Sequence, residues 1–377
     1  MPASSIRRFS VSILAIVLGA ATGLLGVCGP FNDVAADAFC PFILEIFTLG
    51  ITTGTTATTY DPSSNVTRLQ MGAFLSRTVD GIVRRTSRRA VMKRFRNLTP
   101  LPGLISIPGG TPQLAESDGT DIWVAHGGFN GEVSRVRASD GNLLGTWTGA
   151  NNGFGVVVGR GAVWITGAEN PGKIYGLNAS DLPGSVLLLA DNLGDHPRGI
   201  AWDGNRLWTA NQGGSVSIVT LGGFVTTVTT GFSGLAGALD DGSNVWVTDF
   251  VAGTLLKLND SGAILQTVTV GTTPQYPVFD GANIWVPNAG SASVSIVRAS
   301  SGAVLATLTG NGLNTPAVAG FDGERVLVTN SNGVSLWKAA GLTPLGSQAL
   351  ANQPLGVCSD GLDFWISLRQ ASSLVRF

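Results

Sequence analysis

The sequence predicts an all-β fold, a seven-bladed β-propeller of four-stranded blades, with a small α-helical module at the N-terminus. Three observations predict it. A tryptophan-centred block recurs through residues 103–377, and each copy is followed by short runs in which apolar and polar residues alternate. The chain also holds 52 glycines and only 12% charged residues, a composition that suits many short strands joined by turns.

Residues 1–28 are predicted to be a secretory signal peptide. Arg7 and Arg8 precede an uncharged, largely apolar stretch that ends at Cys28, and this order is typical of export signals. The stretch is nearly long enough to span a bilayer, so an uncleaved anchor is the alternative. A lipoprotein signal is a third interpretation, which Val27 disfavours because a small residue is wanted before the lipidated cysteine. The protein is therefore expected outside the cytoplasm.

The three cysteines fit an exported protein. Cys28 and Cys40 lie close in sequence and could form a disulfide if both remain after cleavage. Cys358 falls in a strand pattern and is predicted to be a small buried residue. Their spacing resembles no zinc site, so neither a metal nor another cofactor is expected.

Residues 31–80 are predicted to fold as helix, loop and helix. Apolar residues recur with helical spacing between Asp37 and Leu49, and Gly50 then supplies a stop signal. A loop rich in threonine and glycine follows. Thr67 opens the second helix, with Gln70 at the spacing of a capping box.

This module resembles a single S-layer homology repeat. The resemblance rests on four separate elements in the right order, namely Phe31-Asn32-Asp33-Val34, Gly50-Ile51-Thr52-Thr53-Gly54, Tyr60-Asp61-Pro62 and Thr67-Arg68-Leu69-Gln70. It implies a helical module at the cell envelope or cell surface that binds acidic polysaccharide attached to peptidoglycan. The family usually carries three such repeats, whereas this chain shows one, so other chains could be needed to complete a binding site.

The same resemblance implies the wall-binding residues. Its candidate polymer contacts are Asp33, Thr67, Arg68 and Gln70. A guanidinium pairs well with a carboxylate, so Arg68 would contact an acidic sugar. This sequence departs from the family at Leu69, which stands where alanine is usual. The alternative for Arg68 is a solvated residue near the start of a helix.

Residues 81–102 form a basic connector that is predicted to be helical. Seven arginine and lysine residues lie between residues 84 and 96, with apolar residues on one helical face. Such a helix either separates two domains as a solvated linker or lies on an anionic surface. Nucleic acid is not an expected partner because the protein is exported.

Residues 103–377 carry the propeller repeat. An apolar-Trp-apolar strand recurs at Trp123, Trp164, Trp208, Trp246, Trp285 and Trp365, and Leu327 takes the place of tryptophan in one copy. The spacing runs from 38 residues (Trp208 to Trp246) to 44 residues (Trp164 to Trp208). Four short strands in about 40 residues is the period of a propeller blade. The repeats are similar to the YVTN family of surface propellers.

An aspartate precedes the tryptophan strand in most copies. These residues are Asp118, Asp203, Asp241, Asp280, Asp322 and Asp360. Each stands before a glycine or in a short turn, and we interpret all of them as turn formers rather than catalytic groups.

Polar residues that interrupt the repeat are predicted to gather on one face of the ring, which we call the loop face. The candidate ligand contacts there are His126, His196, Arg198, Asn211, Asp249, Tyr276, Asn288 and Asn330. Side-chain capping of turns is the alternative role for the asparagines and the aspartate. The expected ligand is a protein or a carbohydrate of unknown identity.

Two functions remain open at this point. The first is a non-catalytic propeller that serves as a binding platform, because no nucleophile or phosphate-binding motif is present and no catalytic residue is identified. The second is an exported lyase or hydrolase that uses the loop face with a divalent metal. The streptogramin lyases use histidine and glutamate on such a face, but this chain lacks a matching set of glutamates.

The ring is predicted to close with strands from both ends of the propeller. The seventh copy of the repeat stops after its third strand, Ser373–Phe377. Residues 103–107 precede the first copy and resemble the fourth strands of the other copies. We therefore expect them to form the outer strand of the last blade.

Overall fold

The computed structural model describes residues 30–34, 39–48, 52, 54–67, 71–72, 74–75 and 103–377. The chain divides into two compact units, Met1–Arg88 and Arg89–Phe377. The predicted signal peptide, the basic connector and residues Arg68 and Gln70 lie outside the described residues. Within the described part of the chain, no helix is both long and apolar enough to cross a membrane.

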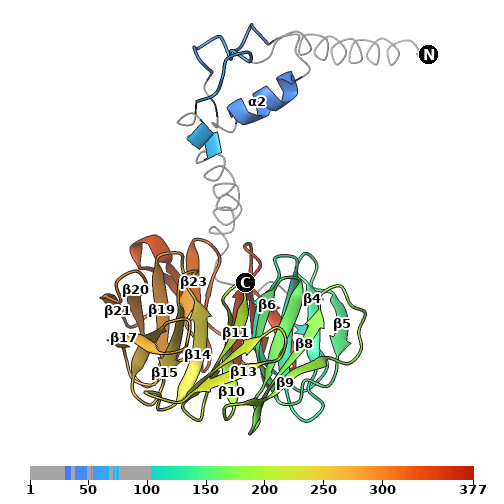
Figure 1. Ribbon diagram of the computed structural model, residues 1–377, viewed down its shortest axis with the longest axis vertical. Coiled ribbons are helices and arrows are strands. Elements are labelled where there is room, and N and C mark those ends of the chain that lie inside the picture. Colours follow the sequence, from blue (N-terminus) through green and yellow to red (C-terminus); the bar gives the residue numbers. More distant parts are fainter. Residues whose placement is uncertain are drawn as a thin grey trace, which may run out of the picture. The chain divides into compact units, whose positions relative to one another are not determined.

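The second unit is a seven-bladed propeller in which every blade is a four-stranded antiparallel sheet. Figure 1 labels strands of several of these blades. Blade 1 contains β2 (Thr111–Ser117), β3 (Asp121–Gly127), β4 (Val133–Arg137) and β5 (Leu143–Trp147). Blade 2 contains β6 (Gly153–Gly159), β7 (Ala162–Gly167), β8 (Gly172–Asn178) and β9 (Leu187–Leu193). Blade 3 contains β10 (Pro197–Trp202), β11 (Arg206–Asn211), β12 (Ser215–Thr220) and β13 (Val225–Val228).

The remaining blades follow the same order. Blade 4 contains β14 (Leu235–Asp240), β15 (Val245–Asp249), β16 (Thr254–Leu258) and β17 (Ile264–Thr269). Blade 5 contains β18 (Val278–Phe279), β19 (Asn283–Asn288), β20 (Ser293–Arg298) and β21 (Val304–Leu308). Blade 6 contains β22 (Ala319–Phe321), β23 (Arg325–Asn330), β24 (Gly333–Lys338), the short helix η1 (Ala339–Gly341) and β25 (Thr343–Ala349).

Blade 7 closes the ring as the sequence predicts. It contains β26 (Pro354–Ser359), β27 (Phe364–Leu368), β28 (Ser373–Arg376) and, as its outer strand, β1 (Ile105–Ser106) from before the first blade. The amide of Ile107 donates to the carbonyl of Ser372 at 3.0 Å, and the Ile107 side chain is fully buried. The paired segment is shorter than the predicted 103–107, but the closure itself is confirmed.

The recurring aspartate does more than form a turn. In five blades its carboxylate accepts a hydrogen bond of 2.7–2.9 Å from the indole Nε1 of the tryptophan five residues later. The same carboxylate also accepts backbone N–H groups of the turn, as Asp280 does from Ala282 and Asn283. These tryptophans are buried, and a buried indole N–H needs an acceptor. The aspartate therefore joins the turn to the core of the blade.

Two blades depart from this arrangement. In blade 6, Leu327 has no indole, and Asp322 accepts instead from the guanidinium of Arg325 at 2.7 Å. In blade 2 the aspartate is replaced by Gly159, and the Nε1 of Trp164 is buried without a hydrogen-bond partner among the described residues. A Cβ on Gly159 would lie 2.8 Å from the ring of Trp202, so glycine here leaves room for that side chain.

The described part of the first unit has a small apolar core of its own. Phe31, Val34 and Ile43 are buried, and the Phe31 ring packs edge-on against Phe47 with centroids 5.2 Å apart. The helix α2 (Cys40–Thr48) supplies Ile43 and Phe47. It matches most of the predicted helix between residues 37 and 49. The second predicted helix is described only at residues 71–72 and 74–75, so a wholly helical module stays a prediction.

The cysteines are in two different states. Cys40 is disulfide-bonded, whereas Cys358 is a free thiol buried in β26 of blade 7, as predicted from its strand pattern. Cys28, the partner that the sequence suggests for Cys40, lies outside the described residues.

Candidate functional site

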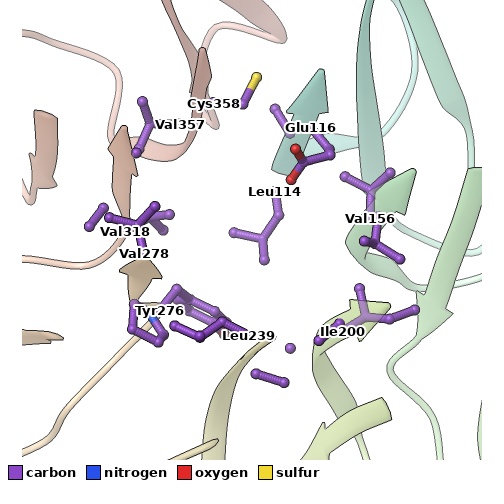
Figure 2. Close-up of a pocket in the computed structure, with 18 of the residues that line it drawn as sticks. Leu114, Glu116, Val156, Ile200, Leu239, Tyr276, Val278, Val318, Val357 and Cys358 are labelled. Atoms are coloured by element: carbon purple, nitrogen blue, oxygen red, sulfur yellow. The ribbon is translucent and has the colours of Figure 1, made fainter. Parts of the chain in front are cut away.

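The inner strands of the seven blades surround a cavity of about 440 Å³ on the axis of the ring. Its walls are mostly valine, leucine, isoleucine, alanine and glycine. These residues suit the innermost strand of each blade, because that strand packs against the innermost strands of the two adjacent blades. Figure 2 shows the Glu116 carboxyl pointing into this cavity from blade 1, among side chains that include Leu114, Val156 and Val357. A cavity of this size can hold a small organic ligand.

Glu116 is a departure from the repeat. In each blade one residue of the inner strand is paired with the recurring tryptophan, or with Leu327 in blade 6, and this register makes the blades directly comparable. Glu116 is that residue in blade 1. The equivalent residues of the other six blades are Val157, Ala201, Leu239, Val278, Gly320 and Cys358. We call these seven equivalent residues the Glu116 row. Glu116 is its one residue with a carboxyl group, and no residue of the row carries an amine.

The surroundings of Glu116 favour its neutral form. Burial among apolar side chains raises the pKa of Glu116 to about 7, and a hydrogen bond from the Ser117 backbone offsets part of this effect. Among the described residues, no arginine, lysine or histidine forms an ion pair with it. Burial likewise raises the pKa of the Cys358 thiol well above its usual value, and the negative charge of Glu116 adds to that rise.

Aromatic and acidic residues stand one position further along the inner strands, toward the hairpins that hold the recurring aspartates. Trp202, Phe279 and Phe321 are half-buried there and line the cavity, together with Asp240. Burial raises the pKa of Asp240, against the lowering effect of a hydrogen bond from the Gly242 amide at 3.0 Å. We call this end of the cavity the hairpin mouth.

Near the opposite end, toward the loop face, Phe154, Arg198 and Tyr276 form a cluster. The Arg198 guanidinium lies over the Phe154 ring at 4.9 Å, and that ring is 5.8 Å from the Tyr276 ring. Burial raises the pKa of Tyr276 to about 12, although Arg198 hydrogen-bonds to its hydroxyl. The buried Nε of Arg198 has no partner among the described residues. Two of the predicted loop-face residues are thus brought together across the ring.

Five other predicted loop-face residues are buried inside their blades. His126, Asn211, Asn288 and Asn330 each contact a serine of the third strand, at 2.9 Å (Ser134), 2.9 Å (Ser217), 3.0 Å (Ser295) and 2.9 Å (Ser335). Burial also lowers the pKa of His126, whose Nδ1 donates to the Gly110 carbonyl at 3.0 Å. The carboxylate of Asp249 accepts backbone N–H groups from Ser233 and Ala252 at 2.7 and 2.9 Å. These side chains hold loops and strands together.

His196 is the exposed histidine of the propeller. Its Nδ1 contacts the carboxylate of Asp195, and its backbone has a φ of 52° in the left-handed region. His126 and Asp249 do not join it in a metal site. Among the described residues, no three side chains of histidine, cysteine, aspartate or glutamate form a group that could hold a metal ion.

Sequence reasoning missed the cavity residues Glu116, Trp202 and Asp240. Aligning the copies of the repeat by their tryptophans would have found Glu116, because it is the one charged residue in its row. The hairpin mouth could not be found in this way, because residues from different blades compose it.

In the first unit, Asp33 lies in a structural position. Its carboxylate accepts backbone N–H groups from Tyr60 at 2.9 and 3.0 Å and from Asp61 at 2.7 Å, and these bonds lower its pKa. The carbonyl of Thr67 accepts from the Met71 amide at 2.9 Å, as at the start of a helix. Polymer binding by Asp33 and Thr67 remains a prediction.

Comparison with known families identifies the N-terminal module. Residues 30–71 match the S-layer homology domain. Such domains generally bind cell-wall polysaccharides, and the match indicates a protein of the cell surface or cell envelope. No curated protein matches this chain significantly.

Comparison with solved structures supports the propeller. Virginiamycin B lyase from Staphylococcus aureus superposes with a TM-score of 0.62 at 16% identity, covering 73% of this chain and 97% of that chain. The WD40 propeller domain of Doa1 gives 0.61 at 12% identity, with 74% and 95% covered. Kuenenia stuttgartiensis hydrazine synthase gives 0.60 at 14% identity, with 75% and 98% covered. At these identities the similarity shows the fold alone.

Proposed function

We propose that this protein is exported, is held in the cell envelope by its S-layer homology domain, and displays a non-catalytic propeller as a binding platform. The match at residues 30–71 carries the proposal, because that domain is a wall-binding module. The partner of the module is an acidic polysaccharide attached to peptidoglycan. Arg68 supplies the cation that pairs with it, and Thr67 and Gln70 of the same sequence motif are further candidate contacts.

Two features of the propeller support a binding role. Most of the polar residues that interrupt the repeat, such as Asn211 and Asp249, form hydrogen bonds with groups inside their own blades. The axial cavity is largely apolar and large enough for a ligand, which is typical of small-molecule binding sites.

Anchoring is tested with the full chain and purified cell-wall sacculi. Replacement of Arg68 by alanine is expected to weaken binding by roughly tenfold or more, since a hydrogen bond to a charged group is worth about 1.5–3 kcal/mol. The matched control is Arg137→Ala, which removes an exposed propeller arginine paired with Asp140. Equal loss in both variants, or unchanged binding after removal of residues 31–80, would show that the module is not the anchor.

The alternative function is an exported lyase or hydrolase that uses a divalent metal on the loop face. The contact between the exposed His196 ring and the Asp195 carboxylate favours it, because imidazole and carboxylate groups are common metal ligands. Virginiamycin B lyase shares the fold.

A chelator separates the two functions. A metal at 100 times its Kd would stabilise the protein by about 2.7 kcal/mol, which corresponds to a rise in Tm of roughly 5–10 °C for a domain of this size. We expect the Tm to stay within about 1 °C when the protein is dialysed against chelator and then supplied with Mg²⁺, Mn²⁺ or Ca²⁺. A rise that disappears in His196→Ala, with His126 left in place, would support the metal-dependent enzyme.

A further inference from the structure

The axial cavity carries acidic groups and lacks basic ones. Its titratable lining residues are Glu116, Asp240, Tyr276 and Cys358, and none of its lining residues is arginine, lysine or histidine. An ionised carboxylate among apolar walls is unfavourable unless a cation pairs with it. Asp121, by comparison, is buried in the same blade and pairs with Arg135. Glu116 has no such partner among the described residues.

The aromatic side chains of the hairpin mouth are also without cations. Elsewhere in the propeller, Arg135 lies 5.0 Å over the Trp123 ring, and Arg206 lies 5.0 Å over the Trp208 ring. Among the described residues, no cation lies over Trp202, Phe279 or Phe321. Half-buried aromatic rings that line a cavity together with carboxylates form a favourable environment for an organic cation.

The remaining length of the cavity is apolar. The row of Leu114, Tyr276 and Val318 lies two residues before the Glu116 row in the inner strands, on the side of the loop face, which is about 7 Å at the usual rise of a strand. Phe154 and Leu355 pack against the apolar cluster of that row. A ligand that enters at the hairpin mouth would therefore extend a hydrocarbon chain toward Tyr276.

We propose that the cavity binds a small organic amine, with its ammonium group at Glu116, Asp240 across the cavity as a second negative charge near the aromatic rings of the mouth, and its apolar chain between the inner strands. This inference rests on the proposed binding role of the propeller and names the class of ligand. Its charged end lies toward the hairpin mouth, away from the predicted loop-face contacts, of which Tyr276 alone lines the cavity.

Three probes of equal length test the proposal by titration calorimetry on the full chain: hexylammonium, hexanol and hexanoate. Hexylammonium is expected to bind at least tenfold more tightly than hexanol, and hexanoate is expected not to bind. Glu116→Gln should weaken hexylammonium binding by tenfold or more and leave hexanol unchanged. Because this substitution keeps the shape of a half-buried side chain, the variant should fold as well as the parent chain.

The matched control is Asp191→Asn, which removes one negative charge from an exposed position of β9. It should leave all three affinities unchanged. Asp240→Asn, at the mouth, should weaken hexylammonium binding by a smaller factor than Glu116→Gln. Equal binding of hexylammonium and hexanol, or an equal loss in Asp191→Asn, would overturn the proposal. Sacculus binding should be the same in all these variants, so failure of the anchor and failure of the cavity site are distinguishable.

The pH dependence provides a second measurement. Glu116 is mostly protonated below pH 7 in the free protein, because its pKa is raised to about 7, and only the carboxylate attracts an ammonium group. Affinity for hexylammonium should therefore rise between pH 6 and pH 8. The other titratable groups of the cavity do not produce this rise: Cys358 and Tyr276 have raised pKa values and stay neutral, and Asp240 is on the opposite side of the ring in another blade. In Glu116→Gln the affinity should be nearly independent of pH over this range, and a persistent rise would contradict the assignment.

Discussion

Replacement of residues 104–107 by Gly-Ser-Gly-Ser is expected to lower the Tm of the propeller by roughly 10 °C or more. The segment contains β1 and the fully buried Ile107, which packs in the core cluster between blades 1 and 7. Loss of a buried isoleucine side chain alone costs about 2–5 kcal/mol, and each kcal/mol shifts the Tm of a domain of this size by roughly 2–4 °C. The lost pairing with β28 adds to this cost.

The same replacement should also promote association. It leaves the outer edge of β28 unpaired at the seam of the ring, and an exposed strand edge is a template for pairing with another chain. Light scattering after size exclusion measures this outcome. The control is Leu104→Ser, which changes an exposed side chain of the same segment and should leave both Tm and mass unchanged. An unchanged Tm in the four-residue replacement would mean that β1 does not close the ring.

Asp280→Ala is expected to destabilise the propeller by about 3 kcal/mol, a fall in Tm of roughly 6–12 °C. The carboxylate accepts from Trp285 Nε1 at 2.7 Å and from the backbone of Ala282 and Asn283 at 2.9 and 2.7 Å. Trp285 is fully buried, so the substitution leaves its indole donor without an acceptor in the core. Thermal and denaturant unfolding measure the loss.

The matched control for this prediction is Asp140→Ala. Asp140 also accepts a backbone N–H in a hairpin, from Asn142 at 2.9 Å, and pairs with Arg137, but its surroundings are exposed. Its removal should lower the stability far less than the removal of Asp280, because exposed ion pairs contribute little. Similar losses in Asp140→Ala and Asp280→Ala would show that the turn, and not the bond to the buried indole, determines the stability.

Much of the fold could be predicted because each blade is local in sequence. Adjacent strands are joined by short hairpins, so the tryptophan, the aspartate five residues before it and the alternating strands all lie within one copy of the repeat. Comparison of the copies then revealed the missing fourth strand of the last blade and its replacement near residue 105.

The candidate site was harder to predict for two physical reasons. The inner strands are bulged, as between Pro112 and Ala115 in β2, and a bulge changes which residues face the axis. Counting alternate residues along β2 therefore does not place Glu116 in the cavity. The sequence also did not decide the role of polar residues at strand ends. Such a residue can face a ligand or, like Asn211 and Asn288, hydrogen-bond to a serine of the neighbouring strand.

The sequence by itself determined the seven blades, their closure and the wall-binding resemblance of the first unit, since all three depend on patterns within a few tens of residues or on their repetition. Only the tertiary structure decided that Arg198 and Tyr276 meet at one end of the cavity and that Glu116 faces Cys358 in the neighbouring blade near the other. These residues belong to different blades. The distances between them depend on the radius and closure of the ring, and the sequence of a single copy of the repeat does not determine either.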